Sequence, residues 1–103
     1  MSRLVARDAR VLWHPFTQAR TAPPPLEVAS ARGAWLTLHD GQRVLDGISS
    51  WWTCTLGHGH PAIVQAIARQ AELLDHVLLA GATHEPAVAV AERLVAQIGR
   101  AHV

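Results

Sequence analysis

The chain has no lysine, and all nine of its basic residues are arginine. Without a side-chain amine, none of its side chains forms a Schiff base with a carbonyl compound, which excludes that form of covalent catalysis from these 103 residues. The single cysteine, Cys54, excludes an internal disulfide and is typical of a reducing compartment. The net charge of +1 gives no electrostatic basis for binding nucleic acid or an anionic membrane.

Long apolar runs are missing as well. No stretch approaches the ~20 apolar residues that span a bilayer, and the arginine-containing start is not followed by the apolar segment of a secretory signal. We therefore expect a cytoplasmic protein that does not enter a membrane. Half of the residues are nevertheless hydrophobic, and the mean hydropathy is +0.13. Since a chain of this size buries only a thin core, we expect much of its apolar surface to face the rest of a larger protein.

The pattern of apolar residues predicts an α+β fold, a small antiparallel β-meander followed by two helices. Asp40-Gly41 is a hairpin signal between two strands. Pro61 and Pro86 open helices, because the first helical positions need no backbone N–H. The predicted elements are a weak helix over 3–12, an extended proline-ended connector over 18–25, strands over 26–30, 34–38 and 43–46, a turn at 31–33, a loop over 47–59, and helices over 61–75 and from about 85.

Two aromatic motifs contain the strongest candidates for a binding site: Trp-His-Pro-Phe-Thr at 13–17 and Ser-Ser-Trp-Trp at 49–52. Beside a glycine-containing loop, the indoles of Trp51 and Trp52 would pack a long apolar substrate and offer an N–H donor. The alternative is that they fill a core or an interface. For the first motif, the alternative to a substrate contact through Phe16 is a chain-entry segment that buries its two aromatic side chains.

Other side chains give weaker signals. His58 and His60 have the spacing of two metal ligands, but a zinc site needs three or four, and Cys54 lies at no zinc-like spacing from them. We therefore predict no metal site, and we expect Cys54 to be an ordinary buried thiol. Thr83 is expected to cap the last helix, and His84 has no assigned role. The carboxylates show no paired arrangement for acid–base chemistry: Asp40, Asp46, Asp75 and Glu85.

Taken together, the two aromatic motifs resemble the amino-terminal part of the class III pyridoxal-phosphate (PLP) aminotransferases. Within that group they are most similar to the adenosylmethionine–8-amino-7-oxononanoate aminotransferases (diaminopelargonic acid synthases) of biotin synthesis. Residues 56–61, Leu-Gly-His-Gly-His-Pro, resemble a turn common to the wider class III group, and residues 81–87 match another segment of the same family. The resemblance runs from about residue 12 to residue 97.

This resemblance implies a type I PLP fold, a homodimer and small-molecule substrates. It implies that an amino group moves from S-adenosylmethionine to 8-amino-7-oxononanoate, giving 7,8-diaminononanoate. In that family the tryptophan at the position of Trp51 lines the substrate pocket, and a tyrosine at the position of Phe16 contacts the oxononanoate. The lysine that holds PLP lies beyond the segment seen here, so the fragment alone is expected to be inactive. No residue here is assigned to cofactor binding.

Two other interpretations stay open. One is a stand-alone, non-catalytic binding module that reuses an aminotransferase-like amino-terminal domain. The other is a small metal-binding protein that uses His58 and His60.

The last six residues, 98–103, equal one reading frame of a common sequencing-adapter DNA (ATC GGA AGA GCA CAC GTC). We therefore interpret residues 1–97 as the natural amino-terminal segment and residues 98–103 as an adapter-derived tail.

The source DNA, sequenced from an independent library, is expected to continue past the codon for Gln97 into a long, lysine-containing region. Codons for residues 98–103 followed by a stop in that library would contradict the interpretation and favour a small stand-alone protein.

Overall fold

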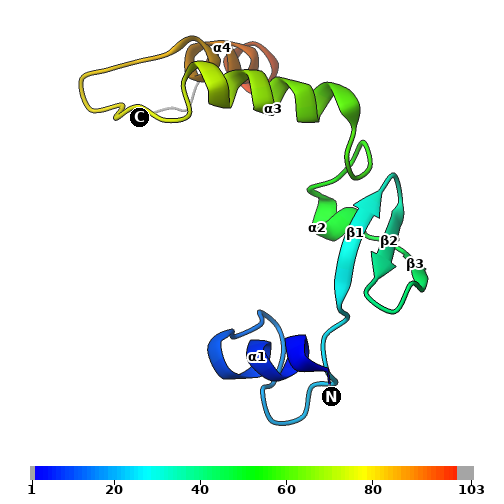
Figure 1. Ribbon diagram of the computed structural model, residues 1–103. Helices are drawn as coiled ribbons and strands as arrows, with labels where there is room; N and C mark the ends of the chain where they lie inside the picture. Colours follow the sequence, from blue (N-terminus) through cyan, green and yellow to red (C-terminus); the bar gives the residue numbers. More distant parts are fainter. Residues whose placement is uncertain (1, 100–103) are drawn as a thin grey trace. The chain divides into compact units, whose positions relative to one another are not determined.

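The computed structural model describes Ser2–Gly99 (Figure 1); residues 100–103 of the expected tail lie outside the described residues. The chain divides into two compact units, Met1–Ile63 and Val64–Val103. Its elements follow the order α1 (Arg3–Val11), β1 (Val28–Arg32), β2 (Trp35–Leu38), β3 (Arg43–Leu45), α2 (Ser49–Trp52), α3 (Pro61–Leu73) and α4 (Glu85–Ile98). The predicted α+β class, an antiparallel meander followed by two helices, is confirmed.

The first helix is closed by a local cap. The side chain of Ser2 accepts a hydrogen bond from the backbone N–H of Val5 at 3.2 Å, which satisfies one of the unpaired donors at the helix start. At the other end, Leu12 donates to the carbonyl of Asp8 at 2.9 Å. The weak helix predicted over 3–12 is therefore present.

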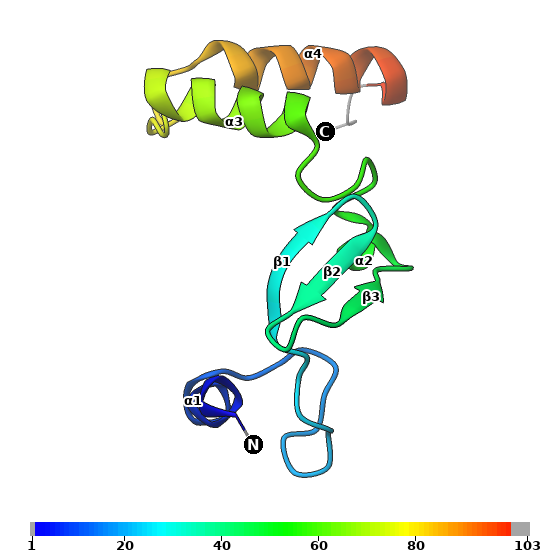
Figure 2. The same cartoon turned by 45° about the vertical axis from the view of Figure 1, so that its right-hand side comes forward.

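The three strands form one antiparallel sheet in the order β1-β2-β3, drawn in cyan and green in Figure 2. Arg32 pairs with Trp35, and Trp35 pairs with Leu45. The predicted turn at 31–33 is wrong in its position, because pairing continues through Arg32 and leaves Gly33-Ala34 as the connection. Gly33 has a φ of +57°, a conformation that glycine adopts without steric cost.

The last two helices begin where their prolines predict, at Pro61 and at Glu85. The predicted cap at Thr83 is wrong: the N-cap position belongs to His84, and its side chain makes no capping hydrogen bond. An extended His84 places the helix start one residue later than the threonine would. None of the described helices is long and apolar enough to cross a membrane.

Very little of the apolar surface is buried within the described part of the chain. Only Val5 and Leu38 are buried hydrophobic residues, at 7% and 9% exposure. Neither α3 nor α4 has a buried residue, although both have apolar stripes. Large apolar surfaces left open are typical of interfaces, and a sheet of three short strands cannot cover them.

The isolated 103-residue chain is expected to melt over a broad temperature range and to bind a hydrophobic dye at room temperature, because so few apolar side chains are buried. Differential scanning calorimetry and dye fluorescence measure this directly. A sharp, cooperative transition of the monomeric chain would contradict it and would favour a stand-alone module.

Candidate functional site

The sheet ends in a hydrogen-bonded cluster that the sequence did not reveal. Asp46 directly follows β3, and its side chain is only 6% exposed. One oxygen, Oδ2, accepts from the hydroxyl of Ser50 at 2.8 Å and pairs with Nε2 of His58 at 2.7 Å. In the sequence, the only sign of this cluster was a serine four residues after Asp46, together with His58, which had no assigned role. The three residues come together only in the folded chain.

These contacts lower the pKa of Asp46 from 3.8 to about 2. The largest cause is the backbone N–H of Ser50, followed by the side chains of His58 and Ser50, while desolvation opposes the shift. Donors that bind the charged form of a carboxyl group favour its ionisation. Since Asp46 is therefore an ionised acceptor, Nε2 of His58 must bear the proton in their bond.

This arrangement does not activate Ser50 as a nucleophile. A serine nucleophile donates its proton to a base, whereas the Ser50 hydroxyl donates to Asp46, which is already ionised and weakly basic. The His58 nitrogen lies farther away, at 3.4 Å, and donates to the same carboxylate oxygen. The cluster therefore holds the backbone in place and does not form a catalytic triad.

The cluster of Asp46, Ser50 and His58 includes one residue of an unusual turn. The segment predicted as loop contains α2, in which all four residues have positive φ, from 45° at Ser50 to 71° at Trp52. None of them is glycine. A left-handed helical conformation costs roughly 1–2 kcal/mol per such residue, so the prediction of an ordinary loop missed it. Strained backbone of this kind concentrates at functional sites and persists only when its surroundings hold it.

The chain that follows this turn is hydrogen-bonded to the connection between β1 and β2. Gly33 and His58 exchange two backbone hydrogen bonds, at 2.9 and 2.8 Å. Next to this pair, Gly57 has a φ of +87°, and a Cβ there would lie 3.1 Å from the Cα of Gly33. The close approach therefore requires glycine at position 57.

The turn brings the two predicted aromatic motifs together. The rings of Phe16 and Trp51 meet edge to face, with centroids 5.0 Å apart and planes at 79°. Such a contact is worth roughly 0.5–1.5 kcal/mol beyond burial. Both side chains stay open, at 89% exposure for Phe16 and 56% for Trp51. The pair thus forms an accessible aromatic wall.

The remaining aromatic residues of these motifs are exposed as well. Trp52 is 75% exposed and Trp13 98%. The alternative in which the first motif buries its aromatic side chains is therefore wrong within this chain. Trp52 shares the turn with Trp51, but no ring contact joins it to Phe16 in the described residues.

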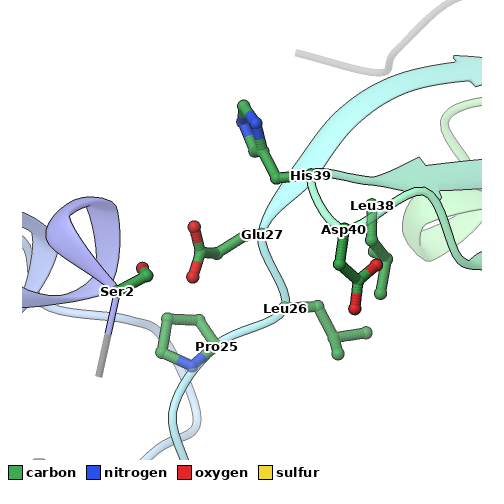
Figure 3. Close-up of a pocket in the computed structure, with 7 residues that line it drawn as sticks. All are labelled: Ser2, Pro25, Leu26, Glu27, Leu38, His39 and Asp40. Carbon is green, nitrogen blue, oxygen red and sulfur yellow. The ribbon is translucent and has the colours of Figure 1, made fainter.

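Two hollows mark the surface of the first unit. The larger, of about 390 Å³, lies where the chain enters β1 and leaves β2 (Figure 3). Glu27, His39 and Asp40 line it, but it contains none of the predicted site residues. The smaller, of about 130 Å³, lies beside the carboxylate cluster and is lined by Gly33, Ala34, Asp46, Ser49, Cys54, Thr55, Gly57 and His58. This smaller hollow therefore belongs to the candidate site, because Ser49 of the strained turn also lines it.

The other predicted residues take no part in the cluster. Cys54 is half-buried rather than buried, and its sulfur lies 3.8 Å from the hydroxyl of Thr53, which is not a base. The ring atom Nδ1 is buried without a partner in both His60 and His84. Within Ser2–Gly99, no three metal-binding side chains gather. Nothing here favours the metal-binding alternative.

Comparison with known proteins places this geometry in a family. The model of the class-III aminotransferases matches residues 16–103. The chain is 54% identical over 83 residues to the adenosylmethionine-8-amino-7-oxononanoate aminotransferase of Synechococcus elongatus, covering 81% of this chain and 20% of that protein. A solved structure of the enzyme of the same name from Methanocaldococcus jannaschii matches with a TM-score of 0.82 and 32% identity, over 90% of this chain and 22% of that one.

An omega transaminase from Pseudomonas jessenii, solved in complex with PMP, has the same fold with a TM-score of 0.82 at 24% identity, over 93% of this chain and 22% of that one. The chain belongs to the class-III aminotransferase family. It spans about a fifth of the length of the relatives that it matches.

The class-III family uses PLP, but the residues of this segment do not fit the role of its holder. The sequence has no lysine to form the imine. The Asp46 carboxylate is occupied by Ser50 and His58. No step through the cofactor is therefore assigned to these residues.

Acidification should loosen the turn only at very low pH. Because the folded-state pKa of Asp46 is depressed, its contribution to stability is present above about pH 4 and is lost as the pH falls towards 2. Tryptophan fluorescence of the full-length protein during an acid titration reports the change. The Asp46→Asn variant should lack this component, and identical acid transitions in both proteins would contradict the prediction.

Proposed function

We propose that this chain is the amino-terminal segment of an adenosylmethionine–8-amino-7-oxononanoate aminotransferase. The full-length protein would transfer an amino group from S-adenosylmethionine to 8-amino-7-oxononanoate and form 7,8-diaminononanoate, as a homodimer with PLP. The contact between Phe16 and Trp51 carries the proposal, because it joins the two motifs that point to this enzyme. The identity of 54% to a relative of that name supports the choice of substrate.

In this proposal the segment supplies one wall of the substrate pocket. The oxononanoate has a long hydrocarbon chain, and the rings of Phe16, Trp51 and Trp52 offer it exposed apolar surface. Each aromatic surface would be covered by substrate or by the rest of the protein. The exposed apolar faces of α3 and α4 agree with this proposal, because they would also be covered in the full-length enzyme.

The covalent chemistry would come from outside this segment. When bound, PLP supplies an electron sink for the reacting amino group. The lysine that anchors it and moves the proton would lie in the remaining four fifths of the protein. The segment by itself is therefore proposed to be inactive, and its contribution would be to bind and orient the substrate chain.

Kinetics of the full-length enzyme test the proposed wall. Trp51→Ala should raise the KM for the oxononanoate roughly tenfold, because it removes apolar contact worth about 1–3 kcal/mol. Phe16→Tyr restores a hydroxyl found in the family and should lower that KM about two- to tenfold, the worth of one hydrogen bond.

Trp35→Phe is the matched control. Trp35 lies on β2 with the guanidinium of Arg43 4.9 Å from its ring centroid, and among the described residues no ring contact joins it to either motif. Its KM should stay unchanged. A full-length enzyme that does not turn over the oxononanoate, or a Trp51→Ala variant with an unaltered KM, would overturn the proposed function.

A further inference from the structure

We propose that Asp46 is a positioning residue for substrate binding: through Ser50 and His58 it holds the left-handed turn Ser49–Trp52, and thereby sets Trp51 against Phe16. This inference deepens the proposed function and rests on it for the identity of the substrate. The side-chain hydrogen bonds of Asp46 go to Ser50 and His58, so its effect on the aromatic rings is indirect.

The first step of the argument is the need for a restraint. Four consecutive non-glycine residues with positive φ form a conformation that a free chain rarely adopts. Within the turn, Trp52 donates to the carbonyl of Ile48 at 3.0 Å, and Cys54 donates to that of Ser49 at 3.0 Å. These bonds close the turn but would also be available to a right-handed one, so they do not select the hand.

The second step is that Asp46 ties this turn to fixed structure on both sides. Its backbone N–H donates to the carbonyl of Ala34 at 2.8 Å, which anchors it to the sheet. Its carboxylate takes hydrogen bonds from Ser50 inside the turn and from His58 beyond it. His58 is itself anchored to Gly33 by its backbone. The carboxylate thus connects the strained turn to Asp46 and His58, whose backbones are both hydrogen-bonded to the connection between β1 and β2.

The third step links the turn to the wall. Trp51 directly follows Ser50, has a φ of 59° and meets the ring of Phe16. If the turn relaxed to ordinary φ values, the Cα–Cβ direction of Trp51 would change and the 5.0 Å ring contact would be lost. A misplaced wall weakens substrate binding while leaving the chemical step unchanged.

The test uses the full-length enzyme and the KM for 8-amino-7-oxononanoate. Asp46→Asn should raise this KM about tenfold while kcat stays within about twofold. Adding Ser49→Gly should recover at least about threefold of the loss, because glycine adopts the positive φ of position 49 without cost. The Ser49 side chain makes no hydrogen bond in the described residues, so this second change removes strain and little else.

Asp40→Asn is the matched control, since Asp40 also accepts hydrogen bonds within a turn of the same unit, from the N–H and side chain of Gln42. Its KM should not change. An unaltered KM in Asp46→Asn, a loss confined to kcat, or the absence of rescue by Ser49→Gly would overturn the proposal. If Asp46→Asn does not fold, Ser50→Ala removes the hydroxyl bond to the Asp46 carboxylate and leaves the backbone N–H of Ser50 and the pair of Asp46 and His58 in place.

A crystal structure of the Asp46→Asn enzyme separates this proposal from the proposed function. Positive φ values retained at 49–52 would refute the positioning role even if the enzyme uses the oxononanoate. A relaxed turn would support that role even if the wild-type enzyme proved to act on a different substrate.

Discussion

The backbone pairing of Gly33 with His58 is the constraint on which the site depends. It brings the end of a long loop against the connection between two strands, at a distance that only glycine at position 57 permits. With that end fixed, the His58 ring reaches the carboxylate of Asp46. The residues between Asp46 and His58 must then reverse direction within a short distance, and they do so through the left-handed turn Ser49–Trp52. The position of Trp51 thus depends on this main-chain pairing as well as on the carboxylate of Asp46.

In the proposed function, this segment binds the substrate and the rest of the protein supplies the covalent chemistry. The segment contains an exposed aromatic wall, a hydrogen-bonded support for that wall and no lysine to hold PLP. In a class-III aminotransferase both functions must meet at one site, so the surface left open on this chain is the surface expected to meet the rest of the enzyme. The nearly absent core has the same explanation, since a segment spanning about a fifth of its relatives need not be stable alone.

Local signals predicted the regular elements well. Pro61, Pro86 and the Asp40-Gly41 turn each act through their own backbone preferences, and the helices and the hairpin start where they indicate. The sequence also named Phe16 and Trp51, through motifs whose meaning came from a family and not from spacing. It could not predict α2 or the Asp46 cluster. Propensities assign positive φ to glycine, whereas here tertiary hydrogen bonds impose it on two serines and two tryptophans.

Backbone strain and the proposed binding surface coincide in this chain. Phe16 has a φ of 55° and Trp51 one of 59°, so both rings of the wall project from backbone conformations that aromatic residues normally avoid. A flexible support would let each ring turn away and would require the substrate to order it on binding. In a support that is already hydrogen-bonded, the rings are ordered during folding and not during binding. More of the free energy of apolar contact then contributes to affinity. The price in stability is tolerable only if the rest of the enzyme packs around the segment, and the open faces of its helices are consistent with that requirement.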